Sequence, residues 1–361
     1  MKEPQYSSTF PPSLEGGGVE SPHPSLVDVA VLILFFTRSD TLQLVFNEVR
    51  KARPSRLFLY QDGPRGPQDM PGIEACRAIV SDEQIDWECD VRRQYLQHNQ
   101  GCDPSGFRAH QWAFSLADKV IVLEDDVVPS QSFFTFCKEM LDRYEHDERI
   151  NMICGFNTDE VTTDIQEDYF FTSFQSIWGW ASWRRVAQRW QSDYAFMHKP
   201  QALAQIKAIA RERHLRNSML KMFSDHSQSG KEYFETIYWA DQILNSCLCI
   251  MPTRNLINNV GLTADSTHFS AELQNMPQRM RRIFTMPRYE LQFPLKHPEY
   301  VVEHVQYLHR RYKILGWNHP VTKILYSLEE LFLSLLHGNF RHIFQSFARR
   351  IRKWIGMERH R

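Results

Sequence analysis

Three consecutive acids, Glu124-Asp125-Asp126, directly follow an apolar run at residues 119–123. Adjacent carboxylates repel one another, and a divalent cation with a preference for hard oxygen ligands, such as Mg²⁺ or Mn²⁺, relieves that repulsion. A cation held by one or two carboxylates completes its coordination with water and substrate phosphates. The acids therefore predict a metal-diphosphate site, unless they form a solvated acidic turn before the next helix.

Two tryptophans separated by glycine, Trp178-Gly179-Trp180, form the second chemical feature. Sugars present flat C–H faces, and aromatic rings cover such faces at a low cost in side-chain entropy. Large aromatic side chains also fill hydrophobic cores. We expect at least one of these rings to line a sugar pocket.

The elements that position the acids follow a strand–helix alternation. A continuous apolar run at 29–36 predicts a strand buried on both faces, a helix pattern follows to 49, and a strand is expected at 56–60. A second cycle predicts a helix at 76–81, a strand at 85–89, a helix at 105–116 and a strand at 119–123. This alternation is typical of an α/β fold with a mostly parallel sheet, where ligands bind at the carboxyl ends of strands.

The chain after this alternation is less regular. Helical spacing at 133–141 and an apolar strand at 150–154 complete the regular part, and an aromatic loop region is expected at 169–190. Helices are expected at about 201–226 and 233–247, and a late strand at 255–260. Two further helices, broken near Gly338, are expected in 321–361.

The segment around the acids resembles the metal motif of GT-A glycosyltransferases, in the version found in the N-acetylglucosaminyltransferase I-like group and its bacterial relatives. The resemblance implies that Asp126 binds Mn²⁺ or Mg²⁺ directly, while Glu124 and Asp125 contact the nucleotide ribose and the donor sugar. Segments matching in order are 153–159, 177–185 and 255–268, so the similarity covers about residues 27–270.

The same resemblance implies further contacts to a nucleotide-diphosphate sugar. Arg38 would meet the nucleotide, Asp62 would accept the imide hydrogen of uracil, His110 would lie near the base, and Trp180 would line the sugar pocket. His268 would contact the diphosphate or serve as a second metal ligand. From the residues alone, Arg38 also fits a local ion pair, Asp62-Gly63-Pro64 a plain turn, and His110 a structural histidine.

An inverting glycosyl transfer needs a carboxylate that takes the proton of the acceptor hydroxyl. In the resembled family a Trp-Asp pair supplies it, whereas here Ala240 separates Trp239 from Asp241. Asp241 is the first candidate for the base. Because one extra residue turns a helical side chain by about 100°, Glu235 and Asp265 are kept as reserves.

Composition bounds the class of protein. The chain has 361 residues and a formal charge of −1, so no overall basic field favours nucleic acid as a partner. Seven scattered cysteines without a CxxC pair indicate free thiols of a reducing cytosol. Residues 1–26 are expected to be a disordered arm without a signal peptide or spanning segment, which predicts a cytoplasmic protein.

The last segment is basic and amphipathic. A stripe of phenylalanine, isoleucine and tryptophan in 339–361 faces seven basic residues and one acid. This pattern fits a helix on the inner, anionic face of a membrane, or one packed on its own domain or on a second subunit.

Together these features predict a GT-A-like α/β fold with a nucleotide-sugar half at 27–155, an acceptor half at 156–300 and a helical tail at 301–361. The predicted function is an inverting, metal-dependent glycosyltransferase that moves a sugar, such as a hexose or N-acetylhexosamine, from a donor such as UDP-sugar to a glycan or lipid-linked acceptor. A sugar-1-phosphate nucleotidyltransferase would carry a glycine-rich loop after the first strand, and residues 37–41 hold no glycine. A non-catalytic glycan-binding protein on the same fold is the other alternative.

Overall fold

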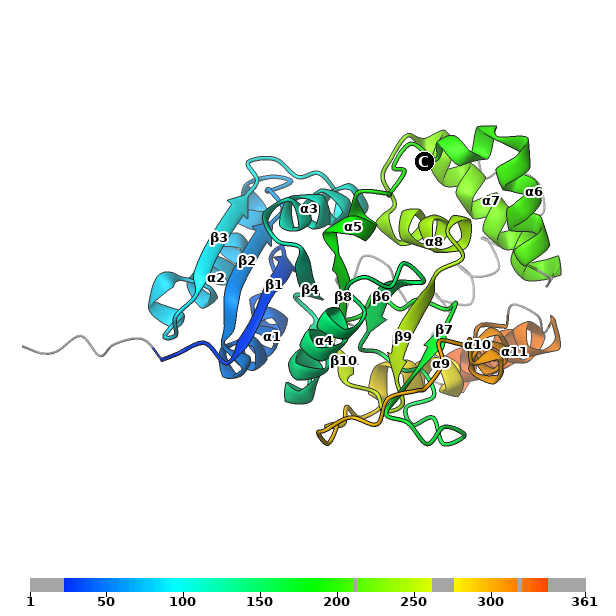
Figure 1. Cartoon of the computed structure of the whole chain (residues 1–361). Helices are drawn as coiled ribbons and strands as arrows, with labels where there is room; N and C mark the ends of the chain where they lie inside the picture. The colour runs from blue at the N-terminus through cyan, green and yellow to red at the C-terminus, as the bar shows by residue number, and fades with distance from the viewer. Residues whose placement is uncertain (1–22, 211–212, 262–275, 317–319, 337–361) are drawn as a thin grey trace, which may run out of the picture.

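The computed structural model describes residues 23–210, 213–261, 276–316 and 320–336. Its centre is an eight-stranded sheet with the order β3-β2-β1-β4-β8-β6-β9-β7 (Figure 1). Six of the eight strands run in one direction, and β7 and β8 oppose them. This confirms the predicted α/β class with a mixed, mostly parallel sheet. The strands are β1 (Val27–Phe35), β2 (Pro54–Gln61), β3 (Asp90–Tyr95), β4 (Lys119–Glu124), β6 (Ile150–Cys154), β7 (Tyr169–Thr172), β8 (Trp180–Trp183) and β9 (Leu248–Pro252).

β1 and β4 are apolar on both sides, and helices cover both faces of the sheet. Val31 and Ile33 face one core layer, and Ala30 and Leu32 face the other. The first layer packs against α1 (Ser39–Ala52), α2 (Met70–Ile79) and α4 (Gln131–Arg143). The second packs against α3 (Cys102–Leu116), α5 (Arg184–Ala187), α6 (Pro200–Ile209), α7 (Arg213–Ser229) and α8 (Phe234–Leu244).

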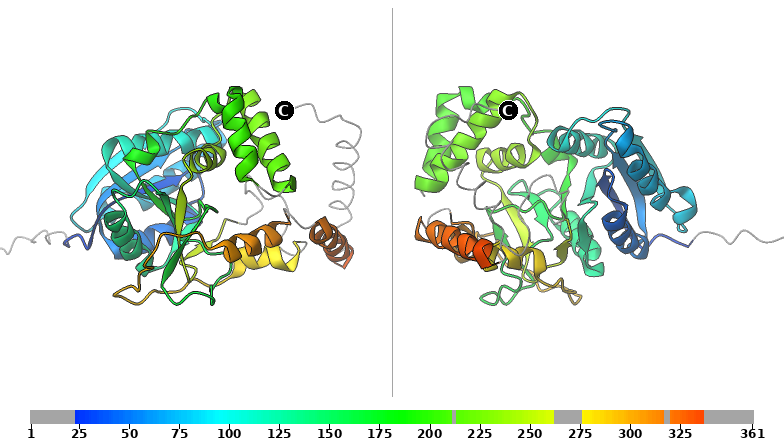
Figure 2. Two further views of the ribbon diagram at one scale, coloured as in Figure 1. Left: turned by 45° about the vertical axis from the view of Figure 1, so that its right-hand side comes forward. Right: turned by 180° about the vertical axis from the view of Figure 1, so that it is seen from behind.

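Smaller elements complete the described chain. β5 (Val127–Pro129) and β10 (Ile257–Asn259) form a separate antiparallel pair. The helices α9 (Gln278–Thr285), α10 (Val305–Leu315) and α11 (Pro320–Leu336) lie together at the end of the molecule that carries β7 and β9 (Figures 1 and 2). Short 3-10 turns occur at Pro67–Asp69, Asp82–Gln84 and Ala195–His198.

Two sequence expectations about elements are wrong. The strand expected at 85–89 lies at β3, Asp90–Tyr95. β3 lies at the sheet edge and is largely exposed. Its sequence is therefore polar and lacks the apolar run by which a strand was predicted. The region 169–190, expected as loop, contains β7 and β8, whose four residues each are fully buried. Strands of four residues that are buried along their whole length carry no alternation that a sequence pattern could detect.

The strand order reverses at β1. The chain leaves β1 outward to β2 and β3, and it returns to the other side of β1 to form β4. In open α/β sheets such a reversal opens a crevice at the carboxyl ends of the two central strands. Arg38 follows β1, and the three acids close β4, so both motifs lie at this crevice.

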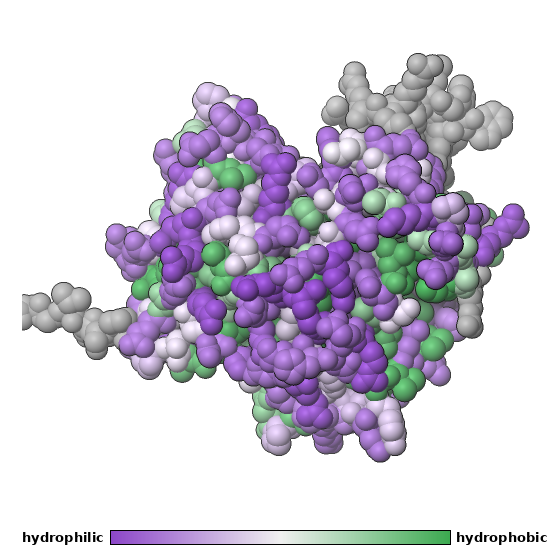
Figure 3. All heavy atoms as spheres, turned by 45° about the horizontal axis from the view of Figure 1, so that its top comes forward, coloured by the Kyte–Doolittle hydropathy of each residue, from purple (hydrophilic) through white to green (hydrophobic). Residues whose placement is uncertain are grey.

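Hydrophilic side chains cover most of the face drawn in Figure 3, and hydrophobic ones gather on its right-hand side. Within the described residues, no helix combines the length and the apolar character that a bilayer crossing requires.

Candidate functional site

Arg38 joins the two aspartates that end β4. Its Nη2 lies 2.6 Å from Asp125 Oδ1 and 2.7 Å from Asp126 Oδ2. The backbone N–H of Phe36 also donates to Asp125, at 3.2 Å. The repulsion predicted for the acids is therefore compensated in part by the guanidinium of Arg38, which lies between β1 and α1.

The compensation is incomplete. Burial, together with the charges of Asp126 and Asp125, raises the pKa of Glu124 well above its usual value. Burial also raises the pKa of Asp125 to about 6, although Arg38 acts in the opposite direction. Burial alone would lower the pKa of Arg38, but the two aspartates raise it. One fixed positive charge faces three acids, so a bound cation or a positively charged ligand would find favourable electrostatics here.

The residues that follow β10 contact Asp126. The N–H of Val260 donates to the Asp126 carbonyl at 2.8 Å, and Arg38 donates to the Gly261 carbonyl at 3.4 Å. A Cβ at Gly261 would lie 1.9 Å from Asp126 Oδ2, so only glycine fits against this carboxylate. Gly261 was assigned no role from the sequence. Its position directly after a short predicted strand is the feature that could have indicated one.

Asp126 retains a free coordination position. Its Oδ1 is buried and has no hydrogen-bond partner. Across the described residues, no three histidine, cysteine, aspartate or glutamate side chains are placed to hold a metal ion together. The site thus fits a cation bound by one protein oxygen and otherwise by substrate phosphates and water. Asp265 and His268, the other predicted contributors, lie outside the described residues.

Asp62 is buried at the end of β2 and is held by its own chain. Its oxygens accept hydrogen bonds from the N–H groups of Gly63 and Gln100 at 2.8 and 2.9 Å, and from the Asn99 amide at 3.0 Å. Burial raises its pKa despite these bonds. Asp62 therefore fixes the turn that leads into α3, and its predicted contact with a base stays a prediction.

His110 and Trp180 lie in the core beneath the crevice, each 1% exposed. The rings contact each other edge to face, and His110 Nδ1 is hydrogen-bonded to the Tyr238 hydroxyl. Burial lowers the pKa of His110 to about 3, which keeps it neutral. Trp178, which is partly buried and packs on Phe156 and Phe284, is the ring of the motif nearer the surface.

The two carboxylates of α8 have different surroundings. Asp241 is buried, and both of its oxygens are bonded to Arg189, at 3.3 and 3.2 Å. Asn245 donates to it as well, at 2.9 Å. Glu235, in the first turn of the helix, is exposed, and its charge contributes to the raised pKa of Glu124. Glu235 therefore lies close enough to Glu124 for their charges to interact, whereas Asp241 is paired with Arg189.

The direction of α8 explains this difference. α8 leads into β9, which runs parallel to β6 and hence to β4. The helix therefore runs back across the sheet, with its first residue at the carboxyl ends of the strands. Asp241 lies six residues later, about 9 Å further along the axis. We call Arg38, Glu124, Asp125, Asp126 and Glu235 the carboxyl-edge cluster.

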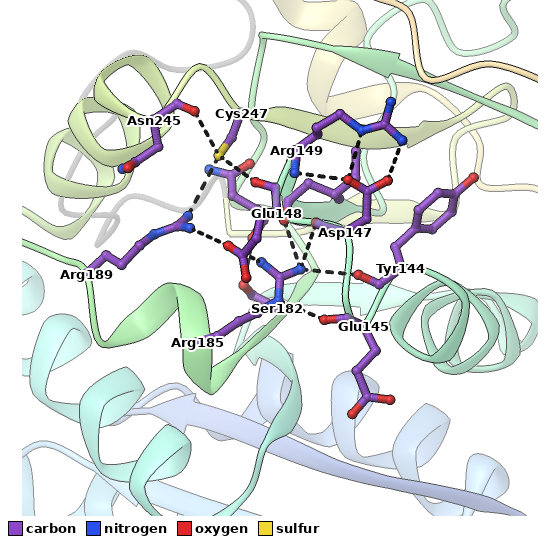
Figure 4. A network of polar contacts seen from close by, with 12 residues as sticks. Tyr144, Glu145, Asp147, Glu148, Arg149, Ser182, Arg185, Arg189, Asn245 and Cys247 are labelled. Carbon is purple, nitrogen blue, oxygen red and sulfur yellow. Dashed lines mark hydrogen bonds and ion pairs between the residues drawn. The ribbon is translucent and has the colours of Figure 1, made fainter.

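Through Arg189, Asp241 belongs to a polar network at the amino ends of the strands. Figure 4 shows the part of this network that Arg185, Arg189 and the turn before β6 form. Arg189 also pairs with Glu148 at 3.1 Å. Arg185 donates to four backbone carbonyls, those of Tyr144, Glu145, Asp147 and Ile150. We call Arg185, Arg189, Asp241 and residues 144–150 the amino-edge network. It ties the turn before β6 to α5 and to the end of α8.

No protein-family model matches the chain, and no curated protein matches it. Among solved structures, it is similar to mouse xyloside xylosyltransferase 1 in its apo form, with 8% identity and a TM-score of 0.32 over 60% of this chain and 81% of that one. It is similar to UDP-glucose pyrophosphorylase complexed with UDP-glucose, with 9% identity and a TM-score of 0.26 over 46% and 81%. It is also similar to the inositol-1-phosphate CTP transferase from T. maritima, with 9% identity and a TM-score of 0.28 over 45% and 73%. Each likeness is distant in both sequence and superposition.

Proposed function

We propose that the protein is an inverting glycosyltransferase that uses a nucleotide-diphosphate sugar, such as a UDP-sugar. The observation that carries the proposal is the carboxyl-edge cluster itself. At the point where the strand order reverses, Arg38 contacts Asp125 and Asp126, and Glu124 and Glu235 lie close enough for their charges to interact. This is the position at which open α/β sheets bind nucleotides.

Asp126 and Arg38 would receive the diphosphate. The unpartnered Oδ1 of Asp126 would hold Mn²⁺ or Mg²⁺, which when bound neutralises negative charge on the leaving diphosphate. Arg38 holds Asp125 and Asp126 in place and adds a fixed positive charge beside the leaving group. Glu124, whose raised pKa favours the protonated form, is suited to donate a hydrogen bond to a sugar or ribose oxygen.

Glu235 is our proposed base. Its exposure at the start of α8 gives an acceptor hydroxyl access to the carboxylate, and it lies near the acids that would hold the donor. The acceptor oxygen forms a bond to the anomeric carbon as the bond from that carbon to the diphosphate oxygen breaks. The hydroxyl proton passes to Glu235, and the nucleoside diphosphate leaves with the bonding electron pair.

The acceptor we propose is a glycan or a lipid-linked glycan. Its binding surface would be formed by residues 156–300, which include α8 and Trp178. Trp178 is partly buried and lies near the surface of that half, where its ring could cover a sugar face.

The donor can be found by thermal shift with UDP-, GDP-, CMP- and dTDP-sugars, each with and without Mn²⁺, because a ligand of the folded state raises its melting temperature. Turnover of the best donor is then compared in Glu235→Gln and in its matched control on the same helix, Asp241→Asn. We expect Glu235→Gln to lower kcat by about 100-fold or more while donor binding persists. Asp241→Asn should keep its kcat and lose stability instead.

Three results would contradict the proposal. Binding of a sugar nucleotide without any turnover by the wild type would indicate a glycan-binding protein. Formation of a sugar nucleotide from a nucleoside triphosphate and a sugar 1-phosphate would indicate a nucleotidyltransferase. A normal kcat in Glu235→Gln together with a lost kcat in Asp241→Asn would return the base to Asp241.

A further inference from the structure

The helix α11 turns its polar side toward the protein. Tyr326 Oη donates to the Ile314 carbonyl of α10 at 2.9 Å, and Glu329 accepts from the N–H of Gln278 in α9 at 2.8 Å. Thr322 and Ser334 are also buried. The side that a surface helix usually exposes is therefore the one that α11 packs against its neighbours.

The apolar side of α11 points outward. Phe332 is 64% exposed and Leu328 57% exposed. At about 100° per residue, Leu335 lies on the opposite side of the helix from Tyr326. A contiguous exposed patch of this kind marks an interaction surface. We call it the α11 apolar face; its members are Val321, Ile324, Leu325, Leu328, Leu331, Phe332, Leu335 and Leu336.

A basic cavity adjoins the same helix. It has a volume of about 280 Å³ and lies between α9 and α10. Four bases and one acid line it: Arg279, Arg282, Arg310 and Lys313, with Asp159. Arg282 pairs with Glu160, and Arg310 pairs with Asp159 and Asp164, so the positive charge available to a ligand comes from Arg279 and Lys313. Ile314 also lines the cavity and bonds to Tyr326 of α11, so the cavity and the apolar face belong to one unit. The sequence that follows α11, residues 337–361, adds seven lysines and arginines against one acid.

We propose that α9, α10 and α11 form a docking surface for an anionic lipid bilayer. The α11 apolar face would enter the interfacial region of the membrane, and the basic cavity would receive the phosphate of an anionic lipid headgroup. This inference does not depend on the proposed glycosyl transfer.

Charge distinguishes the bilayer from the other occupants of the apolar face. A second copy packed through α11 would cover the apolar face but would supply no anion to the basic cavity. The chain's own residues 337–361 would add further bases to a surface that is already basic. Of these three occupants, the anionic bilayer supplies both an apolar phase and the opposite charge.

The test is cosedimentation of the full chain with phosphatidylcholine vesicles, with and without phosphatidylglycerol. We expect the wild type to partition onto anionic vesicles at least about tenfold better than onto neutral ones. The double substitution Leu328→Gln/Phe332→Gln should lower this partition at least about tenfold. Leu44→Gln and Leu116→Gln, at exposed leucines of α1 and α3, are matched controls and should bind like the wild type.

A second variant tests the cavity. Arg279→Gln/Lys313→Gln should lose the preference for anionic vesicles and keep its weaker partition onto neutral ones. Unchanged vesicle binding by the α11 double variant would overturn the proposal, because residues 337–361 would then suffice. A wild-type dimer that the double variant converts to a monomer, without vesicle binding, would assign the face to a second copy. A lower melting temperature of the double variant would assign it to the chain's own packing.

Discussion

The two edges of the sheet each hold an arginine among acids, but the charges are balanced differently. In the amino-edge network, Arg189 is matched by Glu148 and Asp241. Arg185 donates to four backbone carbonyls, and its Nη1, which has no hydrogen-bond partner, lies 3.5 Å from Glu148. In the carboxyl-edge cluster, a single arginine faces Glu124, Asp125 and Asp126, and an Asp126 oxygen is left without a partner.

This difference separates a structural site from a functional one. Opposite charges that are matched within the protein stabilise the fold and leave little net charge to attract a ligand. A buried surplus of one charge costs stability and is relieved when a ligand of the opposite charge binds. The comparison therefore makes a general prediction: substitutions at the amino edge should reduce stability, and substitutions at the carboxyl edge should reduce activity.

The largest expected effect is at Asp126. Asp126→Asn removes the carboxylate charge proposed to hold the cation, and we expect kcat/KM to fall by about 1000-fold or more, equivalent to about 4 kcal/mol. Its free energy of unfolding should change little, because the weakened pair with Arg38 is offset by reduced repulsion from Glu124 and Asp125. Steady-state kinetics at varied Mn²⁺ and denaturant unfolding measure the two quantities.

The matched control is Asp142→Asn. Asp142 pairs with Lys119 at the opposite end of β4, at 2.8 Å. Its replacement should leave kcat/KM within about twofold, since it only weakens a partly exposed ion pair. Equal losses of activity in both variants would mean that the acids of β4 act through the fold and not through a ligand.

The second effect is one of stability, at Arg185. Arg185→Met removes the donor of four hydrogen bonds to the turn before β6, and we expect a loss of about 3 kcal/mol in the free energy of unfolding. Arg149→Met is the control, because Arg149 forms an exposed pair with Asp147 alone and should cost less than about 1 kcal/mol. The kcat of the folded fraction should be unchanged in both. A strong loss of kcat at Arg185 would break the comparison between the edges.

Local patterns were sufficient to predict the strands and helices that carry the carboxyl-edge cluster. β1, β4 and β6 are apolar runs buried on both faces, and such runs stand out without any knowledge of their partners. The acids at the end of β4 are contiguous, so their position was predictable as well. What could not be predicted was which distant groups meet them, since the contact of Arg38 with both aspartates depends on the register of β1 against β4.

The choice between Asp241 and Glu235 shows a different limit of the sequence pattern. Counting residues from Trp239 favours Asp241, but a count along one helix does not reveal which end of that helix reaches the crevice. The direction follows from topology, because the strand after α8 runs parallel to β6. β9 itself was not among the predicted strands, and without it the helix could not be oriented. Asp62, His110 and Trp180 were likewise identified as residues, while their burial depends on contacts far along the chain.

A third prediction concerns the contact between Gly261 and Asp126. Gly261→Ala would place a Cβ 1.9 Å from Asp126 Oδ2, so this oxygen, which accepts a hydrogen bond from Arg38, must move. We expect a loss of about 100-fold in kcat/KM, or about 2.7 kcal/mol, from this displacement. Gly230→Ala is a control of the opposite kind, because its Cβ meets nothing within 4 Å but its φ of +67° strains any other residue. It should lower stability alone, and an equal loss of activity in it would argue against a specific role of the Asp126 contact.

The smallest expected effect is a change in the free energy of unfolding with pH. It distinguishes His110, in the core, from the carboxyl-edge cluster, because the two contributions have opposite signs. His110 is buried and neutral, with a pKa of about 3 in the folded state and an ordinary value near 6.5 when unfolded. Between these values the unfolded chain binds more protons, so stability falls as the pH falls below about 6.5. The buried carboxyl groups Glu124 and Asp125, with raised pKa values, act in the opposite sense, because the folded chain binds the proton more tightly.

The variant His110→Gln separates the two contributions, since glutamine can keep a hydrogen bond to Tyr238 but does not titrate. The difference in free energy of unfolding between wild type and variant should shrink by at most about 1.4 kcal/mol per pH unit as the pH falls from 6 to 4. Urea unfolding at a series of pH values measures it. A pH-independent difference would mean that His110 binds its proton equally well in the folded and unfolded chain. Any loss of stability in acid would then come from other groups, because Glu124 and Asp125 act in the opposite sense.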